Sequence, residues 1–288
     1  MPRIPYDPTL VALTTPGLRE TLFQDASFRG AGPDAICAEC ARLAYVDFDV
    51  VPGPGMGRLT DALALIGFGA PTAIVDADTG TEAFATLTPE GRVLVSFRGT
   101  QPDQVKDLLA DANAWLVPWR EGGKVHKGFS KCFDSVSAKV EEALRRATSP
   151  SPPIFTGHSL GAAIATLAAS TFKGATLVTF GSPRVGDPAF VATLEAAAIH
   201  RYVDCSDFVT KVPPPLPGLY THCNDDPLYI DRFGDIRRKA SGFSKLVDQF
   251  VAGAAYLWKY AFRAGNVPAK TFADHSPINY IRAFTSEP

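Results

Sequence analysis

The stretch from Lys127 to Asp204 alternates between helical and strand patterns, and this alternation constrains the fold more than any other feature of the sequence. Short apolar runs that fit strands are separated by longer amphipathic or Ala-rich runs that fit helices. The predicted order is helix Lys127–Ala147, strand Ile154–Gly157, helix Leu160–Phe172, strand Ala175–Phe180, helix Pro188–Ala198 and strand Ile199–Asp204. Continuous apolar strands joined by helices indicate an α/β fold, a mostly parallel sheet with helices on both faces.

The flanking segments are predicted to extend this sheet and to cover it. Three strands separated by Gly-containing turns are expected before the alternating stretch, at Thr72–Asp76, Glu82–Leu87 and Arg92–Phe97. Residues 1–33 are irregular and rich in Pro and Thr, a helix is expected at about 34–47, and the run 51–57 has the Gly and Pro content of a loop. Further helices are expected at Ser241–Gly265 and Ile278–Phe284.

Composition and charge exclude several classes of protein. Hydrophobic residues make up 46% of the chain and charged residues 20%, close to the averages of globular proteins, which excludes a disordered or fibrous chain. The 28 Lys and Arg residues are balanced by 30 Asp and Glu residues. The nearest approach to a basic cluster is Arg237-Arg238-Lys239, which is smaller than nucleic-acid binding requires. We therefore expect no nucleic-acid partner.

The sequence also bears on targeting. We expect no secretory signal, because no apolar run follows a basic start at the N-terminus. The longest apolar stretches, Leu63–Val75 and Phe250–Phe262, are interrupted and shorter than the roughly 20 residues that span a bilayer. These patterns predict a protein without a transmembrane segment that is cytoplasmic or exported by a signal-independent route, and they leave its true location and its oligomeric state unknown.

Five cysteines are an odd and sparse number, which favours reduced thiols over a disulfide scaffold. Cys37 and Cys40 form a C-x-x-C pattern with two interpretations. One is a redox pair or half of a zinc site, and the other is two small core residues on one face of an Ala-rich helix. The second is favoured because no further C-x-x-C or group of histidines completes a metal site.

The sequence Gly157-His158-Ser159-Leu160-Gly161 has the pattern G-x-S-x-G and lies between a predicted strand and a predicted helix. In this context the pattern is typical of a nucleophile elbow, a sharp turn that exposes a serine above the end of the sheet. Glycines are needed there because neighbouring backbone comes too close for a Cβ atom. The alternative is a Gly-flanked turn in which Ser159 only caps the following helix.

Five segments resemble the class 3 lipase family, the fungal-type triacylglycerol lipases with an α/β-hydrolase fold. They are, in chain order, Val93–Thr100, Val125–Phe129, Gly157–Leu167, Val178–Gly186 and Asp207–Pro214. The similarity extends from about residue 70 to the C-terminus, and the first 70 residues match only loosely, at Ala44-Tyr45. The resemblance implies a single α/β-hydrolase domain over residues 1–288. Residues 1–70 are then an N-terminal helical extension and residues 232–270 a helical insertion.

A serine nucleophile needs a histidine base and a carboxylate that orients the base, and in α/β-hydrolases these follow in the order Ser, Asp, His. The predicted strand Ile199–Asp204 leads into two candidate acids, Asp204 at its end and Asp207 three residues later. Only two histidines come later in the chain, His222 and His275. The resemblance selects Asp207 as the acid and His275 as the base, and it implies a structural role for His222.

An oxyanion hole needs two hydrogen-bond donors directed at the oxygen of the tetrahedral intermediate. One is expected to be the backbone N–H of Leu160, the residue after the nucleophile. The resemblance implies that Thr100 supplies the second donor and that Asp111 holds the Thr100 hydroxyl. The alternatives are a turn threonine and an acid on a helix surface.

These residues predict a carboxylic ester hydrolase that works through an acyl-enzyme, with an acylglycerol lipase as the first interpretation. No metal, nucleotide or prosthetic group is implied, since the chain shows no phosphate loop and no dinucleotide fingerprint. A short-chain or aromatic esterase and a phospholipase are left open, because a triad does not distinguish among them. A peptidase is disfavoured by the motifs at Arg98–Thr100 and Val125–Gly128, and a non-catalytic scaffold by the presence of all three triad residues.

Two segments are candidates for covering the site and for transient contact with a lipid interface. One is Thr100–Trp119, where the family commonly has its lid. The other lies between Asp231 and His275 and is much longer than the usual connection of about 2–6 residues. Its apolar stripe from Phe243 to Ala261 belongs either to a helix packed permanently on the sheet or to a helix that caps the acyl pocket and exposes apolar surface to lipid.

Overall fold

The computed structural model describes residues 2–48, 54–100, 115–194, 197–215 and 218–285. The strands are β1 (Thr72–Asp76), β2 (Thr81–Leu87), β3 (Val93–Phe97), β4 (Leu116–Pro118), β5 (Lys124–His126), β6 (Ile154–His158), β7 (Thr176–Phe180), β8 (Ala198–Asp204), β9 (Leu228–Ile230) and β10 (Ile236–Arg237). The helices are α1 (Leu10–Thr14), α2 (Ala26–Arg29), α3 (Pro33–Leu43), α4 (Pro54–Ala64), α6 (Lys127–Ala147), α7 (Leu160–Thr171), α8 (Pro188–Ala192), α9 (Gly242–Lys259), α10 (Lys270–Ala273) and α11 (Pro277–Arg282). Short 3₁₀ turns lie at Pro16–Leu18, Leu22–Gln24 and Val209–Lys211.

Eight strands form one sheet in the order β1-β2-β3-β6-β7-β8-β9-β10. The neighbours from β3 to β9 are parallel, whereas β1, β2 and β3 form an antiparallel meander and β10 pairs antiparallel with β9. The predicted mostly parallel α/β sheet is therefore confirmed. Because parallel strands deliver their carboxyl ends to one edge, the loops after β6 and β8 meet at the same edge of the sheet.

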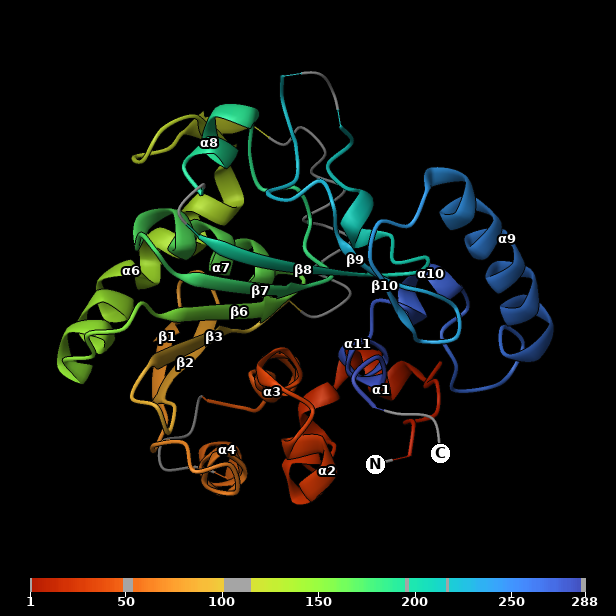
Figure 1. Ribbon diagram of the computed structural model, residues 1–288, viewed down its shortest axis with the longest axis horizontal. Helices are drawn as coiled ribbons and strands as arrows, with labels where there is room; N and C mark the ends of the chain where they lie inside the picture. The colour runs from red at the N-terminus through yellow and green to blue at the C-terminus, as the bar shows by residue number, and fades with distance from the viewer. Residues whose placement is uncertain (1, 49–53, 101–114, 195–196, 216–217, 286–288) are drawn as a thin grey trace.

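Helices cover both faces of the sheet, with α6 and α7 on one side and α3, α4 and α11 on the other (Figure 1). Each side has its own apolar core. Phe129, Phe133 and Phe155 belong to the core beside α6 and α7, and Phe84 and Phe180 to the core beneath α3. Burial on both faces explains why the central strands have continuous apolar runs instead of an alternating pattern.

The prediction of a loop at 51–57 is wrong from Pro54 onward, because α4 begins there. Proline is well suited to the first turn of a helix, where its missing N–H leaves no bond unmade. Gly55 then marks a close approach, since a Cβ atom on it would lie 2.1 Å from the carbonyl oxygen of Asp47. Residues 49–53 lie outside the described part of the chain.

The N-terminal segment predicted as irregular contains α1, α2 and two 3₁₀ turns, and it is held by a buried ion pair on α3. Arg42 and Glu39 are both fully buried, and the Arg42 Nη2 lies 2.6 Å from Glu39 Oε1. The guanidinium also donates to the carbonyl oxygens of Pro16 and Glu20, and Glu39 accepts from the backbone N–H of Leu22. The remaining hydrogen-bonding capacity of both charges is thus used by the extension, as a buried pair requires.

Cys37 and Cys40 are buried on α3 with free thiols, which agrees with the interpretation as core residues. Burial raises the pKa of both thiols, so neither is a reactive thiolate near neutral pH.

The two ends of the chain pack against each other. The backbone N–H of Asp7 donates to the Asn279 side chain over 2.9 Å, and Ser276 Oγ donates to the carbonyl oxygen of Ala12 over 2.7 Å. The Ile4 N–H bonds to Thr285 Oγ1 at 3.0 Å. Residues 4–12 therefore form part of the support of the segment that carries α10 and α11.

The helix α9 is shorter than predicted, and its apolar stripe points outward. The Ser241 hydroxyl caps its N-terminus by accepting from the Ser244 N–H. Phe243, Phe250 and Trp258 of the predicted stripe are exposed, so the alternative in which this stripe packs on the sheet is wrong. No described helix is both long enough and apolar enough to cross a bilayer.

Candidate active site

Ser159 occupies a strained turn between β6 and α7. Its φ and ψ angles are 59° and −126°, a conformation that L residues rarely adopt. A Cβ atom on Gly157 would lie 2.4 Å from the Gly161 carbonyl carbon, and one on Gly161 would lie 2.1 Å from the Phe97 carbonyl oxygen. Both glycines of the pattern are therefore required sterically, as a nucleophile elbow predicts. The Ser159 side chain makes no capping hydrogen bond to α7, which argues against the capping interpretation.

The three residues predicted as a triad lie within hydrogen-bonding distance of one another. His275 Nε2 is 2.9 Å from Ser159 Oγ, and His275 Nδ1 is 2.8 Å from Asp207 Oδ2. Because the carboxylate only accepts, Nδ1 carries the proton and Nε2 is free to accept the serine proton. Ser159, His275 and Asp207 are 1%, 4% and 0% exposed, respectively, so these bonds are shielded from bulk water. The chain thus brings a nucleophile, a base and an orienting acid together from three distant segments.

The carboxylate of Asp207 is held by more than the histidine. Its Oδ1 accepts from the Val209 N–H at 2.8 Å, and its Oδ2 also accepts from the Tyr280 hydroxyl at 2.5 Å. Burial and the nearby carboxylate of Asp207 raise the pKa of Tyr280. The phenol therefore stays protonated and donates, which fixes the carboxylate facing His275. Sequence reasoning had assigned no role to Tyr280.

Asp204, the rejected candidate acid, does not contact the histidine ring. Its Oδ1 accepts from the backbone N–H of Cys205 at 2.6 Å. Burial and the nearby Asp274 raise the pKa of Asp204 well above the usual carboxyl range. Asp274 in turn accepts from the Tyr6 hydroxyl and the Ser206 N–H and pairs with Lys270. Asp204, Asp274 and the partners of Asp274 therefore support the candidate site without contacting the reacting atoms.

His158, inside the elbow, points away from the Ser159 hydroxyl. Its Nε2 lies 2.7 Å from the His275 carbonyl oxygen, and its Nδ1 lies 2.8 Å from the Tyr45 hydroxyl. Since a carbonyl only accepts, Nε2 donates and Nδ1 accepts from the phenol. Burial lowers the pKa of His158 well below the usual value, in agreement with a neutral ring. Tyr45 thereby links the N-terminal extension to the backbone of the candidate base.

Gly181, which follows β7, packs directly against the Asp207–His275 pair. A Cβ atom on Gly181 would lie 2.9 Å from Asp207 Oδ2 and 3.1 Å from His275 Nδ1, and its φ angle is +63°. The residue stands in the motif Val178–Gly186, which was recognised as a resemblance without a role for this glycine. The motif therefore pointed to this segment of the sequence, but the steric reason for a glycine at position 181 is visible only in the structure.

We expect Gly181→Ala to lower kcat for ester hydrolysis by about a hundredfold, because the new methyl group displaces the Asp–His pair from its geometry. Steady-state kinetics on a soluble ester measures the effect. The matched control is Gly80→Ala, since Gly80 has the same φ of +63° but open space around the Cβ position. It should lose stability through backbone strain, of the order of 1–2 kcal/mol, and keep its kcat. Equal kcat values for the two variants would contradict the steric argument.

His222, the rejected candidate base, is held away from the triad. Its Nε2 donates to the carbonyl oxygen of Thr210 over 2.9 Å. Burial, together with the positive charges of Arg201 and Arg184, lowers the pKa of His222 to about 2. This agrees with the structural role expected from the sequence.

The depressed pKa of His222 predicts a pH dependence of stability. The unfolded chain binds a proton on this residue below about pH 6.5 and the folded chain does not, so stability is lost as pH falls from 6.5 toward 2. Between pH 7.5 and pH 5 the loss from this residue should be about 2 kcal/mol. Urea unfolding at the two pH values measures the difference in the free energy of unfolding. This difference should be smaller in His222→Gln than in the parent protein, and the glutamine amide can keep the bond to Thr210. An unchanged pH dependence would show that His222 is not buried as a neutral ring.

Comparison with known proteins shows which family the central part of the chain resembles. Residues 94–216 match the family model of class 3 lipases. The chain is 30% identical over 172 residues to the secreted mono- and diacylglycerol lipase 1 of Fusarium solani, covering 53% of this chain and 49% of that protein. It is 36% identical over 149 residues to a chloroplastic phospholipase A(1) of Arabidopsis thaliana, covering 42% of this chain and 33% of that protein. The resemblance to class 3 lipases is thereby confirmed for residues 94–216 of the chain. The chain spans about half the length of the Fusarium relative and a third of the Arabidopsis one.

Solved structures support the fold. The native complex of Rhizomucor miehei lipase with its propeptide aligns over 68% of this chain and 66% of that one, with a TM-score of 0.51 and 26% identity. The mono- and diacylglycerol lipase of Aspergillus oryzae aligns over 66% of this chain and 76% of that one, with a TM-score of 0.56 and 24% identity. The predicted α/β-hydrolase fold is thereby confirmed.

The residues predicted to form the oxyanion hole are described only in part. Thr100 lies after β3, and its hydroxyl is buried without a hydrogen-bond partner among the described residues. Leu160 opens α7 with its N–H in the first turn, where helix N–H groups lack intrahelical partners. Asp111 lies outside the described residues, as does most of the lid candidate Thr100–Trp119. The roles of Thr100, Leu160 and Asp111 stay predictions.

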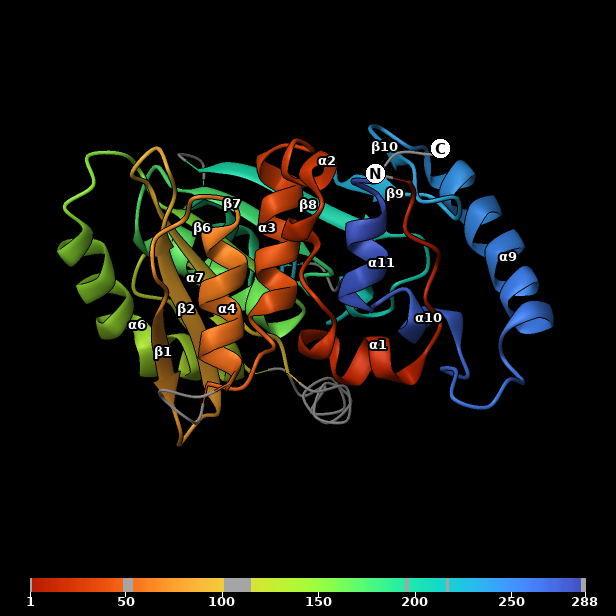
Figure 2. The same ribbon diagram turned by 90° about the horizontal axis from the view of Figure 1, so that it is seen from below.

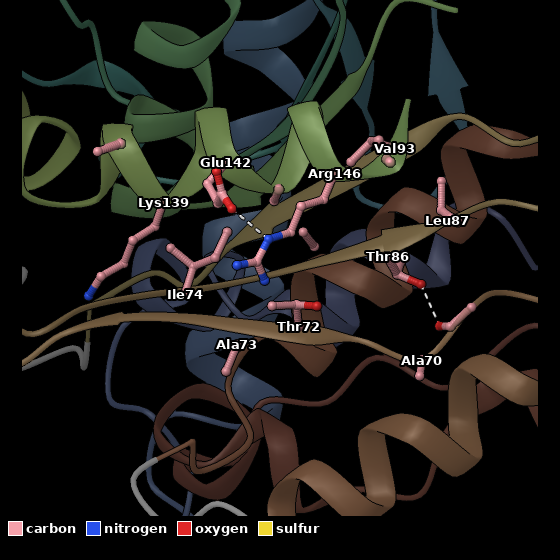
Figure 3. A pocket seen from close by; sticks show the side chains of 15 residues that line it. Ala70, Thr72, Ala73, Ile74, Thr86, Leu87, Val93, Lys139, Glu142 and Arg146 are labelled. Atoms are coloured by element: carbon pink, nitrogen blue, oxygen red, sulfur yellow. Dashed lines mark hydrogen bonds and ion pairs between the residues drawn. The ribbon is translucent and has the colours of Figure 1, made fainter. Parts of the chain in front are cut away.

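A cavity of about 530 Å³ lies between α6 and the outer strands β1 and β2 (Figure 3). Its floor includes Ile74 and Leu87, and Glu142 pairs with Arg146 at its rim. No triad residue lines it, so it is not the candidate active site. Among the described residues, no group of three His, Cys, Asp or Glu side chains is arranged to hold a metal ion.

Proposed function

We propose that this chain is a class 3 lipase and hydrolyses the carboxylic esters of acylglycerols through a covalent acyl-enzyme. The observation that carries the proposal is the continuous hydrogen-bonded line from Ser159 through His275 to Asp207. The relatives add support, since the Fusarium protein is a mono- and diacylglycerol lipase. We also propose that residues 1–288 form a single domain, with residues 1–70 as a helical extension and residues 232–270 as a helical insertion.

The proposed reaction begins when Ser159 Oγ attacks the ester carbonyl carbon and His275 Nε2 takes the serine proton. The Nδ1–H bond to Asp207 stabilises the imidazolium that forms. The N–H of Leu160, together with Thr100, stabilises the tetrahedral oxyanion. His275 then protonates the leaving alcohol, which leaves the acyl group on Ser159. A water molecule, deprotonated by His275, releases the fatty acid and restores the serine.

The experiment is to measure fatty-acid release from emulsified diolein, triolein and phosphatidylcholine, and hydrolysis of p-nitrophenyl esters with acyl chains of two to sixteen carbons. Acylglycerol hydrolysis that exceeds hydrolysis of phosphatidylcholine supports the proposal. The opposite preference would favour a phospholipase, an alternative that the Arabidopsis relative makes specific. Activity confined to the shortest esters would indicate an esterase. A folded protein that cleaves none of these esters would refute the proposal.

A further inference from the structure

The exposed side of α9 is an unusually apolar surface. Phe243 and Phe250 are each 78% exposed, Trp258 is 93% exposed and Phe262, just beyond the helix, is 92% exposed. Between them lie the other exposed apolar side chains of the helix, Leu246, Val247, Val251 and Leu257. Single exposed apolar residues need no explanation, but a continuous patch of this kind marks an interaction surface. We call these eight residues the apolar face of α9.

The opposite side of the helix fixes its orientation. Asp248 accepts from the Tyr229 hydroxyl and pairs with Arg232. Ala252 packs in a small buried cluster with Tyr229, and the Tyr256 hydroxyl donates to the carbonyl oxygen of Val267. These contacts satisfy the buried polar atoms and attach α9 to the edge of the molecule next to β9 (Figure 1). The apolar face is therefore presented outward by a helix that is already packed, and it is not required for the fold.

The charges around the apolar face are mostly positive. From Asp231 to Ala264 the chain has seven basic residues, namely Arg232, Arg237, Arg238, Lys239, Lys245, Lys259 and Arg263. The three acids of this segment, Asp231, Asp235 and Asp248, are ion-paired with Arg237 or Arg232, so the segment carries a net charge of 7 − 3 = +4. The whole chain carries −2. Basic residues thus stand at both ends of the apolar face within an otherwise slightly acidic protein.

The C-terminal end of α9 lies on the same side of the molecule as α10 and α1 (Figure 2). His275 follows α10 within two residues, and α1 adds the exposed side chains of Leu10 and Val11. The Leu10 N–H donates to the Gly265 carbonyl oxygen at 2.9 Å, which joins α1 to the segment after α9.

We propose that α9 docks the protein on an anionic lipid surface, lying in the plane of the interface with its apolar face among the acyl chains and its basic flanks among the headgroups. An apolar helical face bordered by Lys and Arg is the arrangement by which interfacial helices bind such surfaces. A second copy of the chain fits less well, because a two-fold contact through this face would bring two segments of charge +4 together. The surface is distinct from the candidate active site, and docking does not depend on ester hydrolysis.

The test measures binding of the full chain carrying Ser159→Ala to vesicles of ether-linked phospholipids, which contain no ester for the site to cleave. Vesicles of ether-linked phosphatidylcholine are compared with vesicles that also contain ether-linked phosphatidylglycerol, in a flotation assay at several salt concentrations. We expect clear binding only to the anionic vesicles, weakening with salt. Absence of binding to the anionic vesicles would overturn the proposal.

Two sets of variants identify the surface. Replacing Phe250, Trp258 and Phe262 by Ser should lower the partition coefficient between water and the anionic vesicles at least a hundredfold. Three large apolar side chains then no longer enter the interface. Lys259→Gln with Arg263→Gln should lower the partition coefficient about fivefold for each charge removed. The matched controls are Leu65→Ser, another exposed apolar side chain, and Arg145→Gln with Arg146→Gln, exposed charges on α6. The controls should bind as the parent does.

The same substitutions in the chain with Ser159 intact separate docking from catalysis. Hydrolysis of soluble p-nitrophenyl butyrate should be unchanged, while hydrolysis of a long-chain ester dispersed in anionic vesicles should fall with the partition coefficient. Unaltered vesicle binding by the triple serine variant would overturn the proposal. If size-exclusion chromatography then showed that variant converting a dimer to a monomer, the apolar face would be an interface between copies of the chain.

Discussion

Ser159→Ala is expected to abolish ester hydrolysis while the protein stays folded. Removal of the nucleophile of a triad typically lowers kcat by about 10⁴- to 10⁶-fold, and the residual rate comes from binding and the oxyanion hole. The hydroxyl makes its one described hydrogen bond with His275, so its loss disturbs few other contacts. The measurement is kcat on a p-nitrophenyl ester, together with labelling by a fluorophosphonate, which should modify the parent and not the variant.

A thermal unfolding curve is the control for this variant. Alanine at position 159 must still adopt the φ of 59°, so the strain of the elbow is retained and the melting temperature should change little. Activity above a tenth of the parent value in a folded variant would show that Ser159 is not the nucleophile.

His275→Ala and Asp207→Asn are expected to be nearly as impaired as the serine variant. The asparagine accepts poorly from Nδ1–H and favours the wrong tautomer of the ring, which typically costs about 10⁴-fold in kcat. Because the triad acts as a unit, Ser159→Ala combined with His275→Ala should be hardly worse than either alone. The kinetics of the single and double variants on one soluble ester measure this.

The matched controls are the rejected candidates, His222→Gln and Asp204→Asn. Neither side chain contacts the reacting atoms, so both variants should keep most of the activity when folded. An inactive His222 variant beside an active His275 variant would mean that the choice of base is wrong.

Much of the fold was predictable because its signals are local. Apolar runs of strand length between helical patterns predicted the central strands, and α6 has the predicted bounds Lys127–Ala147. The elbow was predictable for the same reason, since all its steric demands lie within five residues. The choice between Asp204 and Asp207 depended on the family resemblance, because Asp204 ends β8 and Asp207 follows only three residues later.

The remaining features depend on contacts between distant segments. No pattern in the neighbouring sequence shows that Gly181 faces the Asp207–His275 pair or that Tyr280 donates to Asp207. The sequence left two alternatives for the stripe on α9, buried or exposed, because amphipathic periodicity shows that one side of a helix differs from the other without showing which side meets the core. In α9 the core side is narrow and partly polar, with Asp248 and Tyr256, while the wide apolar side is exposed.

The packing of residues 4–12 against residues 276–285 has a consequence for synthesis. Residues 4–12 are made long before their partners Ser276, Asn279 and Thr285, and long before His275. Contacts between residues this far apart in the sequence form late in folding and slow it. If the proposed function holds, a nascent chain that has not reached residue 275 lacks its base and does not hydrolyse esters, however complete its sheet is.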